Sequence, residues 1–301
     1  MKTETVISIR GLTKRYGKGP GGLLALDDVD LDVPRGAVYG LLGRNGAGKS
    51  TLIRILIGLL HRTAGDVTIL GGDPADGDES RLACIGYMSE SMEIPGWMRI
   101  GEAIELCAAL EPHWDRADEA RLIAELELDR GAYVGNLSGG QRRKVGLLLA
   151  LAKRPELLIL DEPAASLDTV VRREFLEQVV DLLQDRGTTV FYSSHILSDV
   201  ERIADHVGII DRGRMMLVSR LDDLLDSARR VRLTGDAGAL DRIDLFGAVR
   251  TQRLGAERLV TVVGFDPGSV AELPPGVHAD VMPIGLEDLF IDLVREREVV
   301  S

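Results

Sequence analysis

The stretch "LLGRNGAGKST", residues 41–51, decides the fold of this chain. From Gly43 it follows the pattern Gly-x-x-x-x-Gly-Lys-Ser, and it lies between the apolar "AVYGLL" and the helix-like "LIRILIGLL". A strand, a glycine-rich turn and a helix in this order are the context that a phosphate-binding P-loop requires. The sequence therefore predicts that this segment binds a phosphate.

The residue types in this loop suit a β/γ-phosphate pair. Gly46 and Gly48 let the chain curl closely enough for several backbone amides to converge on the anion. The helix that begins near Lys49 points its N-terminal amides at the same place, Lys49 adds a positive charge, and Ser50 offers a hydroxyl to Mg²⁺. We therefore expect the nucleotide to be held by Gly43, Asn45, Gly46, Ala47, Gly48, Lys49, Ser50 and Thr51.

Composition limits the kinds of partner. The chain has 301 residues, with 36 Lys and Arg against 48 Asp and Glu, and its net charge is -12. This length fits about two domains. Nucleic acid is not expected as a partner, because duplex binding usually needs a basic face. Since no apolar run approaches the roughly 20 residues of a membrane span and "MKTETVISIR" lacks the core of a signal peptide, we expect a soluble chain.

The pattern of apolar residues predicts an α/β fold. The stretches "VISIRGLTKRYG" and "ALDDVDLDVPRG" alternate as half-buried strands do, and the tract from about Ile100 to Leu128 has helical spacing. Strands and helices then alternate from "ELLILDEP" to "HVGIIDRG". We expect a parallel α/β core with an N-terminal antiparallel β subdomain and an inserted α-helical subdomain at about residues 91–155.

The pattern of apolar and polar residues changes from about Met215. Short alternating stretches such as "RRVRLTG" are separated by Gly and Pro, and the chain closes with the helix-like "GLEDLFIDLVRERE". Leu286, Leu289, Phe290 and Leu293 fall on one face of that helix, as expected for core packing. We predict a first domain at residues 4–220 and a small C-terminal α+β appendage at residues 221–301.

An acidic pair ends the buried strand of "LLILDEP". In a parallel sheet, the carboxyl ends of the strands are where ligands bind. Asp161 can hold Mg²⁺, directly or through a water, and Glu162 can polarise the water that attacks the γ-phosphate.

A second anion site is predicted in "NLSGGQRRKV", where a helix opens with Ser138, Gly139, Gly140 and Gln141. One nucleotide needs one such site, so the second site requires an explanation. The combination resembles the ATP-binding cassette (ABC) family, whose signature motif is LSGGQ. In that family two subunits pair head to tail, and each signature caps the nucleotide on the partner's P-loop.

The resemblance covers roughly residues 4–220 and implies a P-loop NTPase of the ABC ATPase type that hydrolyses ATP with Mg²⁺. It implies that Tyr16 stacks on adenine, that Asp168 lies in the loop that communicates across the dimer, and that His195 contacts the γ-phosphate. Taken singly each signal is weak, because a lone Tyr is ordinarily a surface or core aromatic and a lone His is usually structural.

One position departs from the family pattern. After "IGYM" the family commonly places a glutamine that senses Mg²⁺ and the attacking water, whereas this chain has Ser89 and Glu90. A glutamate still offers oxygen to the metal, although it loses the amide donor and adds a negative charge. We expect Glu90 to act as the sensor and as a metal ligand; the alternative is an exposed carboxylate without a catalytic contact.

The tract from "PHWDRADEARL" to "DEPAASLD" and the appendage look like the ATPase subunits of bacterial exporters. This narrower resemblance implies a cytoplasmic homodimer or paired cassette, held at the inner face of the cell membrane by an integral membrane permease on another chain. A soluble ABC ATPase that acts on a non-membrane complex, as an assembly factor does, is the alternative.

The segment "SESMEIPGWMRIGEA" has two interpretations. Its Met92, Ile94, Trp97 and Met98 either line a groove for a short cytoplasmic helix of the permease or pack into the protein's own core.

Overall fold

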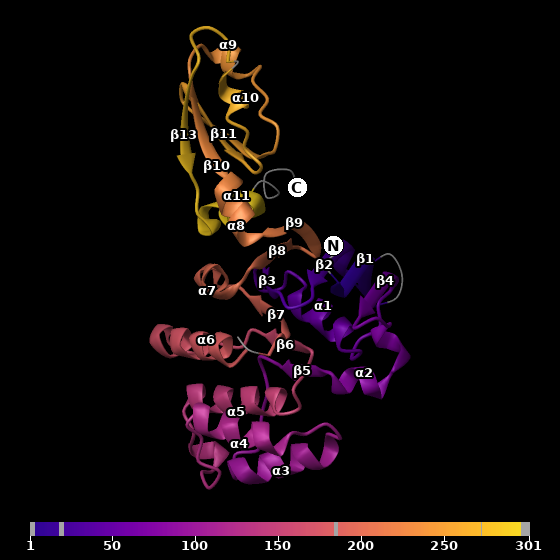
Figure 1. Cartoon of the computed structure of the whole chain (residues 1–301). Coiled ribbons are helices and arrows are strands. Elements are labelled where there is room, and N and C mark those ends of the chain that lie inside the picture. The colour runs from indigo at the N-terminus through magenta and orange to yellow at the C-terminus, as the bar shows by residue number, and fades with distance from the viewer. Residues whose placement is uncertain (1–3, 18–20, 184–185, 272, 296–301) are drawn as a thin grey trace. The chain divides into compact units, whose positions relative to one another are not determined.

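The computed structural model describes residues 4–17, 21–183, 186–271 and 273–295. The chain divides into two compact units, one ending at Val218 and the other beginning at Ser219 (Figure 1). The sequence had placed this boundary after residue 220. No helix within the described residues combines the length and the apolarity that crossing a bilayer requires.

The first unit contains a three-stranded antiparallel sheet at its N-terminal side, in the order β2-β1-β4. Its strands alternate as predicted, since Val29, Leu31 and Val33 of one strand are buried while the residues between them are exposed. The strands are β1 (Thr5–Tyr16), β2 (Leu23–Pro34) and β4 (Ala64–Ile69).

A six-stranded sheet in the order β5-β6-β7-β3-β8-β9 forms the centre of this unit, and neighbours from β5 to β8 are parallel. The strands β6 and β7 are buried along their whole length, as strands covered on both faces are. The strands are β3 (Val38–Leu42), β5 (Ile85–Met88), β6 (Leu157–Asp161), β7 (Thr189–Ser194), β8 (His206–Asp211) and β9 (Arg214–Arg220).

Helices surround this sheet and form the expected helical subdomain, in which α3, α4 and α5 lie together (Figure 1). The helices of the unit are α1 (Lys49–Leu56), α2 (Glu79–Ala83), α3 (Ile100–Leu110), α4 (Arg116–Glu125), α5 (Gly139–Leu151), α6 (Thr169–Leu183) and α7 (Leu197–Ile203). Two short 3₁₀ turns, η1 (Pro74–Asp76) and η2 (Val134–Asn136), complete it.

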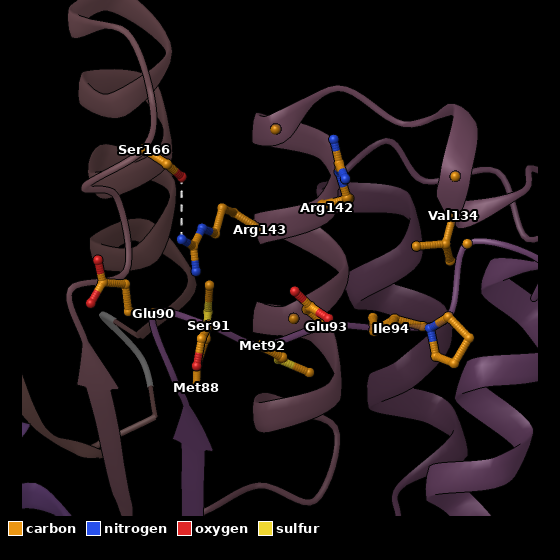
Figure 2. Close-up of a pocket in the computed structure, with 15 residues that line it drawn as sticks. Met88, Glu90, Ser91, Met92, Glu93, Ile94, Val134, Arg142, Arg143 and Ser166 are labelled. Carbon is orange, nitrogen blue, oxygen red and sulfur yellow. Dashed lines mark hydrogen bonds between the residues drawn. The ribbon is translucent and has the colours of Figure 1, made fainter.

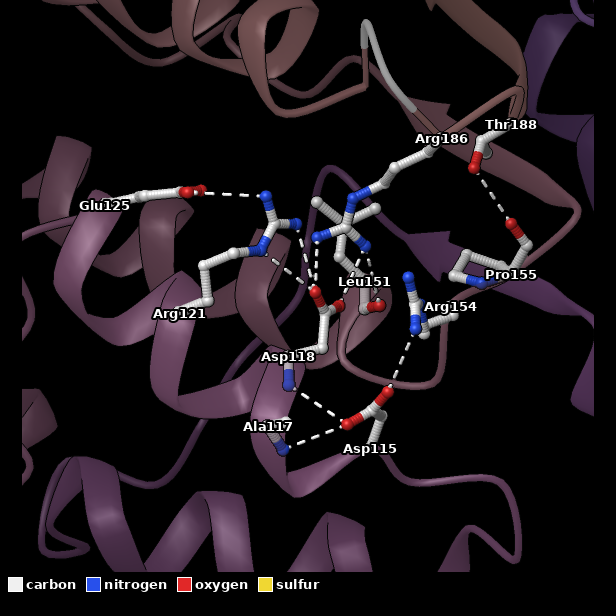
Figure 3. Close-up of polar contacts among 10 residues, drawn as sticks. All are labelled: Asp115, Ala117, Asp118, Arg121, Glu125, Leu151, Arg154, Pro155, Arg186 and Thr188. Carbon is white, nitrogen blue, oxygen red and sulfur yellow. Dashed lines mark hydrogen bonds and ion pairs between the residues drawn. The ribbon is translucent and has the colours of Figure 1, made fainter.

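A buried ion pair ties the helical subdomain to the core (Figure 3). Arg186, which follows α6, donates from Nη1 and Nη2 to the two carboxylate oxygens of Asp118 on α4, at 2.8 and 2.9 Å. Arg121 reaches the same carboxylate from the surface side at 3.0 Å. Because a bidentate arginine–carboxylate pair allows only one relative orientation, this contact fixes α4 against the segment after α6.

The second unit is a four-stranded antiparallel sheet in the order β11-β12-β10-β13. With helices after the first and third strands, this is the ferredoxin-like arrangement, so the predicted α+β class is confirmed. Its elements are α8 (Leu221–Ser227), β10 (Arg229–Thr234), α9 (Ala237–Leu240), β11 (Ala248–Leu254), β12 (Glu257–Val262), α10 (Gly268–Ala271), β13 (His278–Pro283) and α11 (Leu286–Arg295).

The closing helix α11 packs its apolar face inward, as predicted. Leu286, Leu289 and Leu293 are buried and Phe290 is half-buried. On the same helix the buried carboxylate of Asp292 accepts hydrogen bonds from Thr261, Arg230 and Arg250, at 2.6, 2.7 and 2.5 Å.

Candidate functional site

The loop predicted to bind phosphate lines a cavity of about 620 Å³. Residues 44–51 form much of its wall, and Tyr16, Glu90, Glu162 and Arg212 complete it. We call this cavity the P-loop pocket. It gathers residues from β1, the loop after β3, the segment after β5 and the end of β6, which are distant in the sequence.

The glycines of the loop have the geometry of an anion cradle. Gly46 and Gly48 adopt φ of 80° and 112°, in the region that favours glycine. A Cβ on Gly48 would lie 2.7 Å from the carbonyl oxygen of Ala25, so no larger residue fits there. Gly48 caps α1 without a side-chain hydrogen bond, which leaves the first amides of this helix free of a side-chain cap. These features fit a phosphate group.

Lys49 and Glu162 form a buried ion pair inside the pocket. Lys49 Nζ lies 3.0 Å from Glu162 Oε1, and the two side chains are only 5% and 7% exposed. Lys49 also donates to the carbonyl oxygen of Gly43 at 2.6 Å. His195 Nδ1 lies 2.9 Å from the other oxygen of Glu162. The structure thus brings together three residues that the sequence predicted separately.

Glu162 has a strained backbone. Its φ is 49°, a left-handed conformation that a residue with a side chain adopts at a cost. The amide of Glu162 donates to Ser193 Oγ at 3.1 Å, which helps to hold this conformation. In this conformation the buried carboxylate of Glu162 contacts Lys49 of the P-loop.

Two oxygen atoms suited to a metal lie beside this pair. Ser50 Oγ donates to Asp161 Oδ1 at 3.3 Å, and Ser193 Oγ donates to the same oxygen at 2.7 Å. No group of three or more His, Cys, Asp or Glu side chains in the described residues could hold a metal ion. Mg²⁺ in nucleotide sites typically takes one or two protein oxygens and completes its shell with phosphate and water, so Ser50 and Asp161 fit it.

Sequence reasoning missed two residues of this region, Ser193 and Arg212. Ser193 is the last residue but one of β7, which neighbours β6, and the doublet of serines in "YSSH" was its signal. Arg212, with φ of 46°, lines the P-loop pocket from the turn after β8, and nothing in the sequence places that turn beside the loop.

Tyr16 lies at the rim of the P-loop pocket. Its ring is partly exposed, and its hydroxyl is 3.4 Å from Thr51 Oγ1. The ammonium of Lys14 lies 5.1 Å from the ring centroid. A half-exposed aromatic ring at the edge of such a pocket is accessible for stacking.

The signature residues form a helix start of their own. Ser138 caps α5 by accepting from the amide of Gln141, while Gln141 Oε1 accepts from the amide of Ser138, a capping box. Gly139 is exposed, and a Cβ on the buried Gly140 would lie 2.7 Å from Val171, so α6 packs closely there. Residues 138–141 do not line the P-loop pocket of the described chain.

Asp168 begins the neighbouring helix. Its Oδ1 accepts from the amides of Val170 and Val171, both at 3.1 Å, and the residue is exposed. Within one chain Asp168 is therefore a helix cap.

Glu90 borders two cavities. It lines the P-loop pocket and also a second cavity of about 680 Å³, whose lining includes Met88, Met92, Ile94, Arg143 and Ser166 (Figure 2). We call this second cavity the Glu90 groove. Glu90 is therefore part of the wall of both cavities.

The apolar residues after Glu90 do not all follow one of the two interpretations, core packing or the lining of a groove. Met98 is 7% exposed and belongs to the core, whereas Trp97 is 75% exposed, so the core interpretation is wrong for Trp97. Met92 and Ile94 are half-buried and line the Glu90 groove.

Asp199 of α7 adds a buried carboxylate near this site. Burial raises the pKa of Asp199, the positive charge of Arg172 opposes the shift, and the negative charge of Glu162 adds to it. Arg172 Nε lies 3.3 Å from Asp199 Oδ1 and forms an ion pair with it.

Comparison with known proteins agrees with this geometry. A family model described as "ABC transporter" matches residues 26–165. The bacitracin transport ATP-binding protein BcrA of Bacillus licheniformis is 36% identical over 232 residues, which are 75% of this chain and 74% of BcrA. The methionine import ATP-binding protein MetN of Streptomyces coelicolor is 32% identical over 335 aligned positions, which cover 97% of this chain and 95% of MetN.

A bacterial ABC transporter cassette solved as a dimer has the same fold. It superposes with a TM-score of 0.63 at 25% identity, over 71% of this chain and 98% of that cassette. The chain therefore belongs to the ABC transporter family as an ATP-binding, ATP-hydrolysing subunit.

Proposed function

We propose that this chain powers a membrane permease carried by a separate chain, and that the transport is export. The observation that carries the proposed chemistry is the cluster of Lys49, Glu162 and His195 at the P-loop. A buried carboxylate held by a lysine and a histidine, next to a phosphate cradle, is suited to activating a water.

The proposed chemistry assigns one role to each residue of the cluster. Lys49 exchanges its contact with Glu162 for the phosphates of ATP, because its ammonium already lies inside the glycine cradle. This exchange frees Glu162 to act as general base toward the attacking water. His195 holds the second oxygen of Glu162, and in this proposal it would contact the γ-phosphate of bound ATP.

Ser50 and Asp161 would hold Mg²⁺, with Glu90 as a third oxygen at the pocket wall. When bound, the metal would neutralise charge on the phosphate oxygens. Tyr16 offers its ring to the adenine from the rim of the pocket.

The working form in this proposal is a dimer that encloses two ATP molecules. Ser138 to Gln141 form an exposed helix start that does not line the chain's own pocket, which suits a role on the partner's nucleotide. Asp168, exposed at the start of α6, is suited to the same interface. Likeness to a cassette solved as a dimer supports this arrangement.

The permease would dock at the Glu90 groove, whose lining includes Gly96, and at the exposed Trp97 that follows Gly96 in the sequence. An exposed tryptophan suits a binding anchor. The chain would accordingly act in the cytoplasm, peripheral on the inner face of the membrane. Import is the second candidate, because MetN, named for methionine import, aligns over 97% of this chain.

The catalytic proposal is tested by Glu162→Gln, which keeps the shape of the side chain and removes its basicity. Turnover should fall by about 10²–10⁴-fold while ATP still binds, because a general base typically contributes that much. The ATP-bound variant should accumulate as a dimer in size-exclusion chromatography. A variant that stays monomeric at saturating Mg-ATP would contradict both the role of Glu162 and the dimer.

The direction of transport is tested in cells that express this chain with its permease, with bacitracin and methionine as probes. Export predicts greater tolerance of bacitracin with the wild-type chain than with Glu162→Gln. ATP-dependent methionine uptake without such tolerance would favour import. If the chain does not cosediment with washed membranes that contain the permease, the assembly-factor alternative is favoured.

A further inference from the structure

Arg143 on α5 is a half-buried cation that the proposed chemistry does not use. Figure 2 shows its guanidinium between Ser166 and the segment around Glu90. Nη1 donates to the carbonyl oxygen of Ser89 and Nη2 donates to Ser166 Oγ, both at 3.2 Å. Ser89 immediately precedes Glu90, and Ser166 precedes Asp168 by two residues. We call α5, which follows Ser138, the signature helix, the residues around Ser89 and Glu90 the Glu90 segment, and residues 166–168 the Asp168 loop. The side chain of Arg143 therefore joins the signature helix to the Glu90 segment and to the Asp168 loop.

The two hydrogen-bond acceptors of Arg143 are neutral, and its side chain is half-buried. Burial lowers the pKa of Arg143, and the negative charge of Glu90 opposes that shift. Arginine stays protonated at neutral pH in either case. Glu90 and Arg143 also line the same groove, so the negative charge of Glu90 acts on this half-buried cation. Arg143 in turn weakens the negative electrostatic potential that Glu90 produces at the P-loop pocket.

Close packing on either side makes this connection stiff. A Cβ on Gly146 of α5 would lie 3.1 Å from the sulfur of Met92, so the Glu90 segment rests directly on that helix. A Cβ on Gly139 would lie 3.5 Å from Leu167, which follows Ser166 in the Asp168 loop. Because such packed contacts do not deform gradually, a displacement of one segment is transmitted to the others.

We propose that Arg143 is a positioning residue that acts with Glu90 as a charge-matched pair, holding the Glu90 segment and the Asp168 loop in register with the signature helix. The proposal rests on the proposed role of Glu90 at the γ-phosphate. It explains how the carboxylate of Glu90 can line the P-loop pocket although this pocket is proposed to bind the negatively charged phosphates of ATP. It also predicts that the two residues are interdependent.

The test is a double-mutant cycle in the full-length protein with Glu90→Gln, Arg143→Gln and the double variant. Two quantities are measured: kcat, and the dissociation constant for ATP in the presence of EDTA, which needs neither metal nor turnover. Arg143→Gln should lower kcat about 10-fold and weaken ATP binding about 3-fold, because it leaves Glu90 uncompensated beside the phosphates. The double variant should bind ATP as tightly as the wild type and recover kcat to within about 3-fold.

Two further variants separate charge from structure. Arg143→Lys keeps the charge, so it should retain kcat to within about 3-fold, although an ammonium lacks the planar fork with which the guanidinium spans two acceptors. Arg173→Gln removes an exposed arginine from α6, outside both cavities, and should change neither quantity.

If Arg143→Gln reduces kcat and ATP affinity equally in the wild-type background and in the Glu90→Gln background, the pairing is overturned. If it reduces neither quantity in either background, the positioning role is overturned. If Arg143→Gln does not fold, the same cycle is run with Arg143→Met, which also removes the charge and keeps much of the length of the side chain, and whose additivity with Glu90→Gln would overturn the pairing equally. Failure of the proposed function would look different, because Glu162→Gln would then retain wild-type turnover whatever the outcome of the cycle.

Discussion

Two buried ion pairs in the first unit differ in contact geometry and in surroundings. Lys49 and Glu162 meet through a single contact of 3.0 Å beside a cavity of about 620 Å³. Asp118 and Arg186 meet through two parallel hydrogen bonds between α4 and the segment after α6. All four side chains are at most 8% exposed, so burial does not distinguish the pairs.

The difference lies in whether a ligand can replace one partner. A lysine is a point charge that can turn from a carboxylate to a phosphate, whereas a guanidinium held at two oxygens has one geometry. The strained φ of 49° at Glu162 belongs to the first pair. A buried ion pair by itself is therefore weak evidence for a functional site. Here the functional pair is distinguished by the adjoining cavity and by the strained backbone of one partner.

The largest expected effect is the loss of stability on breaking the structural pair. Asp118→Ala leaves the charge of Arg186 buried without its partner, and the free energy of unfolding should fall by about 3–5 kcal/mol. Urea denaturation of the full chain measures it. Arg121→Ala removes the exposed partner of the same carboxylate and should cost only about 0–1 kcal/mol. Similar midpoints for both variants would show that the buried contact of Asp118 with Arg186 adds no stability beyond the exposed contact with Arg121.

The next effect concerns binding. Lys49→Ala should weaken ATP affinity by about 1.5–3 kcal/mol, because a charge-assisted contact disappears. Calorimetric titration with ATP measures it. Lys153→Ala is the matched control, since Lys153 is also largely buried and paired, with Glu111 at 3.1 Å, but lies outside the P-loop pocket. If the two variants lose ATP affinity equally, the pocket does not distinguish the lysines.

A buried carboxylate in the second unit extends the comparison to pH. Burial alone raises the pKa of Asp292, but hydrogen bonds from Thr261, Arg230 and Arg250 together outweigh it, so the pKa lies below its ordinary value. A depressed pKa stabilises the fold above the ordinary value of about 3.9, and this stabilisation is lost as the pH falls further, through the folded-state pKa.

Asp292→Asn should therefore cost about 1–3 kcal/mol at neutral pH and flatten the loss of stability below about pH 4. Thermal unfolding between pH 3 and 7 measures both. Asp288→Asn, which removes an exposed carboxylate 3.7 Å from Arg230, should keep the wild-type pH profile. An unchanged acid profile for Asp292→Asn would show that other groups control acid unfolding.

The smallest effect on stability is expected for Trp97→Ala. Since Trp97 is largely exposed, the melting temperature should shift by the equivalent of about 0.5 kcal/mol or less. Membrane association and permease-stimulated turnover should nevertheless fall. Met98→Ala, at a buried neighbouring position, should cost about 2–5 kcal/mol instead. A Trp97→Ala variant that still copurifies with the permease at wild-type levels would move the docking site elsewhere.

The sequence by itself determined the local motifs. The P-loop, the acidic pair at Asp161 and Glu162, and the signature at Ser138 are each contained in a few consecutive residues. Glycine torsions, helix starts and strand ends depend on near neighbours, and the alternation of strands and helices predicted the α/β core for the same reason. The apolar face of α11 was predicted from helical spacing alone.

Only the tertiary structure decided which of these residues meet. Lys49, Glu162 and His195 come from α1, the end of β6 and the end of β7, and the sheet order β6-β7-β3 brings them together. The burial of Met98 beside an exposed Trp97, and the reach of Arg143 to Ser89 and Ser166, likewise have no local signal. Burial and long-range pairing depend on how distant segments pack, and short-range patterns carry little information about that packing.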